Sequence, residues 1–165
     1  MAGGFMKFGP TYNATQYVRV MHEGMINGNH DISKTIVDAK TEDLAGRIAA
    51  ITADGVGLAN AGAGAVGLFV EDLGDMVNAS EKASFYFRGG EYYISVERMG
   101  ADAASIVAGD ELTTDAEGKL IKATGAEKVV AVATTAPAPF TMGNMFEHAG
   151  VDMNGGNFVG IILYV

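Results

Sequence analysis

The chain has 165 residues, of which 48% are hydrophobic, 19% are charged and 23 are glycine, and its formal net charge is −9. This composition favours one folded domain rich in β-structure and tight turns over a helical bundle or a disordered chain. The acidic balance argues against direct binding of nucleic acid, and the absence of cysteine excludes disulfides, thiolate nucleophiles and zinc–thiolate sites.

The ends of the chain indicate no membrane segment. The start, "MAGGFMKFGP", lacks the apolar core of a signal peptide. The longest apolar runs, such as "FVGIILYV" at the C-terminus, are too short to span a bilayer. We therefore expect a protein that does not enter a membrane.

Residues 1–45 differ in kind from the rest of the chain. They carry aromatic residues among glycine and asparagine, with a strand-like alternation in "QYVRVM". Such a segment, with apolar anchors but no core of its own, is typical of an arm that docks on another chain by adding a strand to a sheet edge. The alternative is an N-terminal strand that folds back on its own domain. We predict an arm over residues 1–45, anchored by Phe5, Phe8, Tyr12 and Tyr17, and a body over residues 46–165.

The stretch "KTEDLAGRIAA" allows two interpretations. A helix that begins at Thr41 would have acids in its first turn and apolar residues along one side. Gly46 and the repeat described next favour a strand from about Arg47 instead.

A turn sequence occurs twice in the body. "TADG" at 52–55 resembles "TTDAEG" at 113–118, and beyond the turns Gly62 matches Gly125 at the same offset of 63 residues that relates Gly55 to Gly118. In both copies a short apolar run leads into the turn and two further apolar runs follow. We predict two three-stranded meanders related by duplication or convergence, with coincidence as the alternative because such turns are common.

The aromatic stretch "SFYFRGGEYYISVER" predicts a β-hairpin with a two-residue turn at 89–90. In that hairpin Phe87 would face Tyr92 and Tyr86 would face Tyr93. Single-strand nucleic-acid binders also carry aromatic platforms, but they need a cationic groove, which this acidic chain does not provide. We therefore assign the four aromatic residues to the core or to a subunit interface.

The C-terminal third adds three further expectations. In "TTAPAPF", Pro137 and Pro139 exclude a central strand and predict a surface connection. "TMGNMFEHAG" predicts one short helix, and "GNFVGIILYV" predicts a last strand. The chain as a whole is predicted to be mainly β, a small β-barrel or β-sandwich built from hairpins and meanders, with at most one or two short helices.

Residues suited to chemistry are few. The sequence has no G-x-S-x-G elbow, phosphate-binding loop or H-E-x-x-H motif. His22 and His30 would approach each other across a hairpin with Asp31 as an oxygen ligand, and His148 is the third histidine, but no spacing demands a metal site. The acids of "GDELTTDAEG" fail the calcium-loop pattern and are interpreted as turn residues. We expect no catalytic residue, no metal and no cofactor.

Five stretches of the body resemble the capsid decoration, or cement, proteins of tailed bacteriophages. They are "AVGLFVEDLGDM", "FYFRGGEYYIS", "IVAGDELTTDAEGKLIKAT", "VVAVAT" and "GGNFVGIILYV". In that family an AGD step leads into a strand, a D-x-x-G-K turn and a VVAVA-like strand, which 108–110, 115–119 and 129–133 match here. The resemblance runs from about residue 47 to residue 165 and does not cover the N-terminal segment.

The resemblance implies a homotrimer that binds the major capsid protein on the outer surface of the virion and stabilises the shell against internal DNA pressure. It further implies synthesis in the cytoplasm of a bacterial host, no enzymatic activity, and no contact with nucleic acid or membrane. Phe5, Phe8, Tyr12 and Tyr17 would then be capsid-interface residues, and Tyr86, Phe87, Tyr92 and Tyr93 would serve trimer or core packing. The target of the arm stays open between the capsid, a neighbouring trimer and its own barrel. The alternatives are a tail-tube or other tail structural protein, and a small His/carboxylate metal-dependent enzyme.

Overall fold

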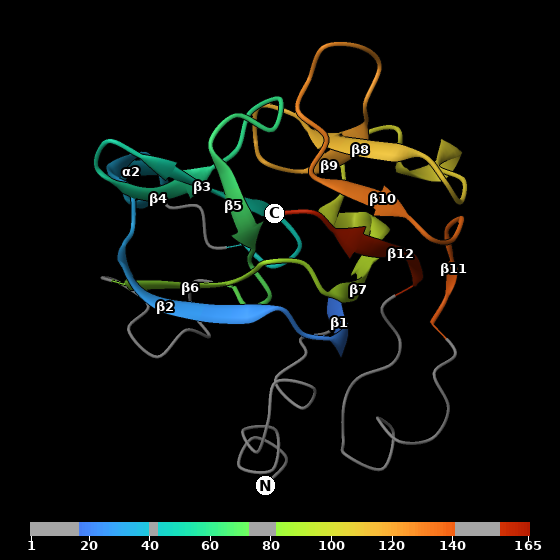
Figure 1. Ribbon diagram of the computed structural model, residues 1–165, viewed down its shortest axis with the longest axis horizontal. Helices are drawn as coiled ribbons and strands as arrows, with labels where there is room; N and C mark the ends of the chain where they lie inside the picture. The colour runs from blue at the N-terminus through green and yellow to red at the C-terminus, as the bar shows by residue number, and fades with distance from the viewer. Residues whose placement is uncertain (1–16, 40–42, 73–81, 141–155) are drawn as a thin grey trace, which may run out of the picture.

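The computed structural model describes residues 17–39, 43–72, 82–140 and 156–165 (Figure 1). In these residues the chain is mainly β and forms two antiparallel sheets. The large sheet has the order β1-β7-β12-β10-β8-β9, with β11 beside β12, and comprises β1 (Val18–His22), β7 (Glu91–Ser95), β8 (Glu111–Thr114), β9 (Leu120–Lys122), β10 (Ala131–Ala133), β11 (Ala138–Pro139) and β12 (Asn157–Leu163). The small sheet has the order β2-β6-β5-β3-β4 and comprises β2 (Met25–Asp31), β3 (Ile48–Thr52), β4 (Gly55–Leu58), β5 (Ala65–Leu68) and β6 (Lys82–Phe87). The predicted mainly β class is confirmed, as two sheets and not as a closed barrel.

The two sheets share one hydrophobic core. Alternate residues of each strand face it, because successive side chains in a strand point to opposite sides. Ile94 and Val159 are cross-strand partners in the large sheet and are fully buried. Ile48, Leu68 and Tyr86 of the small sheet belong to the same buried cluster. The sheets therefore pack face to face.

The other face of the small sheet is covered by α2 (Lys34–Ala39). Ile36 of this helix packs in a second buried cluster with Val56, Phe69 and Phe85 of the small sheet and its flanks. Two short 3-10 helices, η3 (Val96–Arg98) and η4 (Ala103–Ser105), follow β7. In the described ranges α2 is the only α-helix, which agrees with the prediction of at most one or two short helices.

Two copies of one strand arrangement correspond to the sequence repeat. The order β4-β3-β5 in the small sheet equals the order β9-β8-β10 in the large sheet, so the first strand of each copy is central. Gly55 begins β4 and Gly118 lies two residues before β9, and both have positive φ. The repeated strands and turns are thus confirmed, but the predicted meander is wrong, because in a meander the second strand would be central.

Groups elsewhere in the chain cover the outer edge of the second strand in each copy. The Ser33 N–H donates to the carbonyl of Val56 (2.9 Å) and covers the outer edge of β4. The outer edge of β9 is covered in the same way, because the Gly100 N–H donates to Leu120 (2.9 Å) and the Lys122 N–H donates to the Asp102 carboxylate (3.0 Å). The third strand of each copy therefore pairs with the open side of the first.

The predicted hairpin at 89–90 does not form. β6 belongs to the small sheet and β7 to the large sheet, and the chain passes from one to the other through Arg88, Gly89 and Gly90, which all have positive φ. Residues 82–95 instead pair antiparallel with residues 18–31 almost throughout, as Val20↔Tyr92 and Ile26↔Tyr86 illustrate. The aromatic stretch is one side of a long ribbon that bends between the sheets, because its partner is the N-terminal part of the chain and not itself.

The second half of the predicted arm is therefore part of the folded body. Val18 and Val20 of β1 are buried in the core, and β2 forms an edge of the small sheet. Figure 1 shows β2 running along β6. The alternation in "QYVRVM" predicted this strand correctly.

The remaining local predictions have mixed outcomes. The strand expected from about Arg47 is confirmed as β3, while residues 40–42, where the alternative helix would begin, lie outside the described residues. The last strand is confirmed as β12, and Pro137 and Pro139 lie in a connection whose two-residue strand β11 pairs only with the start of β12. The helix expected within residues 141–150 lies outside the described residues.

One hydroxyl joins the two places where the ribbon bends. The Tyr92 hydroxyl donates to the carbonyl of Gly89 (3.0 Å) and accepts from the N–H of Gly24 (3.1 Å). A Cβ on Gly24 would collide with the carbonyl of Phe87, and a Cβ on Gly90 would collide with the Tyr92 hydroxyl. Glycine is required at both positions because the two bends approach each other so closely.

We expect Tyr92→Phe to lower the free energy of unfolding by about 1–2 kcal/mol, because it leaves the partly buried N–H of Gly24 and the partly buried carbonyl of Gly89 without their partner. Urea unfolding followed by circular dichroism measures the change. Tyr93→Phe is the matched control, and it should cost less than about 0.5 kcal/mol. Equal losses in the two variants would contradict the role given to the Tyr92 hydroxyl.

Candidate interaction surface

The structure separates the aromatic residues singled out by the sequence. Tyr86 and Tyr92 are 2% and 0% exposed, and their rings lie 6.1 Å apart between the two sheets. Burial raises the pKa of both phenols. Phe87 is half-buried, and Arg88 lies over its ring (5.9 Å). Phe5, Phe8 and Tyr12 lie outside the described residues.

Tyr93 belongs to a cluster on the outer face of the large sheet. Its ring lies 5.2 Å from that of Phe140, which in turn lies 5.8 Å from Phe158. Arg19, the cross-strand partner of Tyr93, is fully buried, with its guanidinium 5.2 Å from the Phe158 ring and 5.8 Å from the Phe140 ring. A cation over aromatic faces is favourable, so Arg19 takes part in packing. The sequence analysis missed Arg19, although its position between two inward-facing valines placed it on this face.

Tyr17 packs against the body beside an ion pair. The Arg98 guanidinium lies 3.7 Å from the centre of the Tyr17 ring and donates two hydrogen bonds to Asp72 (2.7 and 3.0 Å). Asp72 also accepts from the N–H of Ala45 (3.0 Å). Burial disfavours the charged form of Arg98, but the hydrogen bonds and charge of Asp72 outweigh it, so the pKa of Arg98 is raised. Asp72 therefore links η3 to the segment that precedes β3.

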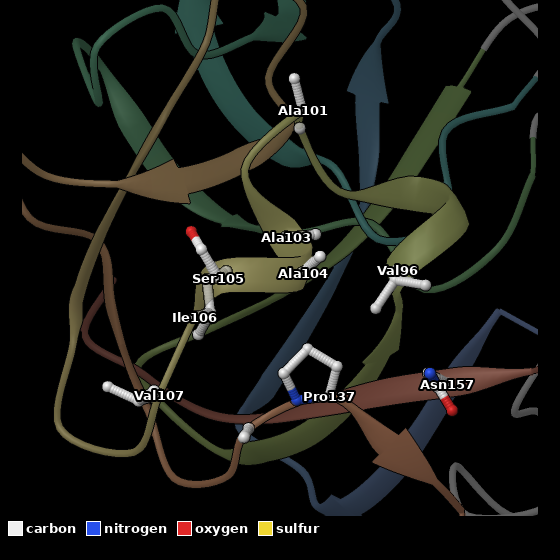
Figure 2. A pocket seen from close by; sticks show the side chains of 11 residues that line it. Val96, Ala101, Ala103, Ala104, Ser105, Ile106, Val107, Pro137 and Asn157 are labelled. Atoms are coloured by element: carbon white, nitrogen blue, oxygen red, sulfur yellow. The ribbon is translucent and has the colours of Figure 1, made fainter.

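A hollow of about 730 Å³ lies on the surface beside the start of β12 (Figure 2). Eleven residues line it: Val96 and Asn157 at one end, seven residues between Gly100 and Val107, and Ala136 with Pro137. We call it the alanine groove. Figure 2 shows Pro137 and Asn157 along one side of the groove and the segment of η3 and η4 along the other.

The lining of the alanine groove suits binding. None of its eleven residues has an ionisable side chain, and Ser105 and Asn157 provide the polar side-chain groups. Proton transfer needs a group that can gain or lose a proton, so these side chains do not supply an acid or a base. Ile106 and Ala103 are buried, whereas Val107 at the rim is 54% exposed. The surface offers apolar contact and a few hydrogen bonds.

Strand pairing places the first described residue beside the alanine groove. The Ser95 N–H donates to the carbonyl of Tyr17 (2.8 Å), and Ser95 is also the cross-strand partner of Phe158. Val96, which follows Ser95, and Asn157, which precedes Phe158, line one end of the groove. The segment of residues 1–16 therefore joins the body at that end of the groove.

A smaller hollow of about 340 Å³ lies between α2, the β3–β4 turn and the turn after β8. Arg47 lines it, and its guanidinium donates to the Asp43 carboxylate (2.7 Å) and to the carbonyl of Glu117 (3.2 Å). Burial raises the pKa of Asp43, but the hydrogen bond and charge of Arg47 outweigh that effect and lower it. Asp43 is therefore held as an ionised partner of Arg47.

The residues considered for metal binding are not brought together. His22 is exposed at the end of β1, whereas His30 lies on β2 in the other sheet, with its ring 5.7 Å from that of Phe85. His148 lies outside the described residues. Across the part of the chain that the structure describes, no group of three or more His, Asp or Glu side chains could hold a metal ion.

The acids of the predicted turn serve the turn itself. Asp115 accepts from the N–H groups of Glu117 (2.8 Å) and Lys119 (3.0 Å). Asp110 accepts from the N–H of Val107 (2.9 Å), and its ion pair with Lys122 measures 3.2 Å. These bonds confirm the interpretation of both acids as turn residues.

Comparison of the sequence with protein-family models and with curated proteins gave no match. In the described ranges, no helix is both long enough and apolar enough to cross a bilayer.

We expect Asp72→Asn to lower the free energy of unfolding by about 2–3 kcal/mol, because it leaves the buried Arg98 guanidinium without its counter-charge. The matched control is Glu117→Gln, which removes the carboxylate from an exposed pair with Lys119 (3.1 Å) and should cost less than about 0.5 kcal/mol. Thermal and urea unfolding at low and high salt measure both. A loss for Asp72→Asn no larger than that of the control would contradict a structural role for the pair.

Proposed function

We propose that this chain is a capsid decoration protein, which binds the outer surface of an icosahedral phage capsid as a homotrimer and stabilises the shell. The body carries the motifs that resemble this family, including the AGD step at 108–110 and the turn at 115–119. In the structure the AGD step leads into β8, and the turn joins β8 to β9. A strand after the AGD step and a turn at 115–119 are what the resemblance leads us to expect, and they support the proposal.

The observation that carries the proposal is the position of the alanine groove. A surface hollow without an ionisable side chain lies where an N-terminal segment with three aromatic residues, Phe5, Phe8 and Tyr12, joins the body. This arrangement favours a protein that works by contact with other chains.

The charge of the chain fits a position outside the shell. A net charge of −9 would oppose contact with packaged DNA, whereas a site on the outer surface requires no such contact. A shell contact through uncharged residues would also depend little on ionic strength. Closed symmetry lets each copy contribute a modest contact while the complex binds strongly.

The proposal predicts the number of copies in a particle. A shell-wide decoration protein should be present at about one copy per major capsid protein, because trimers at the local threefold positions repeat over the whole shell. Quantitative mass spectrometry of purified particles, before and after a mild wash, gives the ratio. A few copies per particle would instead indicate a tail or vertex protein, and complete absence from particles would overturn the proposal.

The proposal also predicts that shell binding needs the N-terminal segment. Deletion of residues 1–16 should leave the body folded, because the buried strand β1 begins at Val18, and should weaken binding to capsids that lack this protein by at least about tenfold. Co-sedimentation with such capsids measures binding, and circular dichroism with urea unfolding serves as the control for folding. Undiminished binding of the shortened chain would contradict the prediction.

A further inference from the structure

The N-terminal segment and the body differ in chemistry. The only charged side chain in residues 1–16 is Lys7, so the segment carries +1 and residues 17–165 carry −9 − 1 = −10. Its large apolar side chains are Met1, Phe5, Met6, Phe8 and Tyr12, and no other charged residue stands among them in the sequence. A mildly positive, aromatic segment is complementary to an acidic body that offers an apolar groove.

The alanine groove has room for large side chains. Its exposed walls include Ala101, Ala104 and Ala136, and Gly100 adds no side chain at all. Small residues leave the hollow open, and the buried Ile106 closes its floor. An aromatic side chain placed there would bury apolar area on both partners without leaving a charge unpaired.

The length of the segment allows it to reach another molecule. Sixteen residues span up to about 55 Å when extended, which exceeds the distance needed to pass from one small body to the next. The segment joins its own body beside the groove, and in a ring of copies its length is enough to reach the groove of the neighbouring copy. Such a head-to-tail contact closes when the rotation returns to the first copy.

From these observations we propose that the alanine groove of each copy holds the N-terminal segment of a neighbouring copy. The occupant is residues 1–16 of a second copy of this chain, with an aromatic side chain in the groove. This inference rests on the trimer of the proposed function and gives the segment a different direct partner from the shell. Loss of the segment then weakens shell binding because the copies separate and the advantage of several simultaneous contacts is lost.

The chain contains no cysteine, so a pair of introduced cysteines tests the contact directly. Full-length protein that carries both Phe8→Cys and Ala104→Cys is oxidised under mild conditions and run on a non-reducing gel. We expect covalent dimers and trimers that disappear on reduction, with at least about tenfold more product than the control pair Phe8→Cys and Ala126→Cys. Ala126 is an exposed alanine in the loop between β9 and β10, outside the groove.

A second pair of variants tests the groove without cysteines. Ala104→Trp fills the hollow and should lower the fraction of trimer at least about fivefold in sedimentation equilibrium, whereas Ala126→Trp should leave it unchanged. Circular dichroism of both variants shows whether the body stays folded.

The outcomes separate this inference from the proposed function. A disulfide within one chain, equal cross-linking in the control pair, or a monomeric wild-type protein would overturn the exchange of segments. If wild-type protein binds capsids but the variant with Phe8→Cys and Ala104→Cys forms no cross-link between copies, the decoration role stands and the segment contacts the shell itself. If the cross-link forms but wild-type protein does not bind capsids, the linkage between copies stands and the decoration role fails.

Discussion

The structure depends on the hydroxyl of Tyr92, which fixes the bend of a single long ribbon. Residues 18–31 and 82–95 pair along nearly their whole length, and the ribbon contributes β1 and β7 to the large sheet and β2 and β6 to the small one. Both sides of the ribbon change sheets at the same place, where Gly24 and Gly89 share the Tyr92 hydroxyl. At this bend the ribbon passes from one sheet to the other.

The two copies of the repeated unit are held together by a second polar contact. Thr114, at the end of β8, donates to the carbonyl of Ala59 (2.9 Å) and accepts from the N–H of Gly62 (3.0 Å). The Ala61 N–H donates to the Thr114 carbonyl (3.0 Å), and the Lys128 N–H donates to the Ala61 carbonyl (3.2 Å). The loop between the second and third strands of the first copy is therefore satisfied by the second copy. Each copy therefore both donates hydrogen bonds to the other and accepts them from it.

The sequence predicted local elements well because their causes are local. The Asp and Gly turns need a side-chain acceptor and a positive φ, and the alternation of Val18, Arg19 and Val20 needs only one buried face. The prediction of a hairpin failed at residues 89–90, where two glycines are compatible both with a hairpin turn and with a bend between sheets. Which of the two forms depends on residues 18–31, some sixty residues away, which compete for the same backbone groups. The same competition explains why residues 18–31, which were predicted to belong to the arm, pair within the body instead.

The alanine groove was harder to predict from the sequence because its lining contains no ionisable side chain and no sequence motif. The alanines and glycine at 100–104 carry no periodic or chemical signal, and Val96, Pro137 and Asn157 come from separate parts of the chain. The pairing of Tyr17, Ser95 and Phe158 in adjacent strands brings the groove to the place where the N-terminal segment joins the body. The described edges at β4 and β9 are already covered by the chain itself, so they are not open to strand addition. The alanine groove beside β11 and β12, by contrast, presents exposed apolar side chains such as Val107. The proposed exchange of segments uses this surface and not a sheet edge, because aromatic side chains gain more from an apolar hollow than from added backbone pairing.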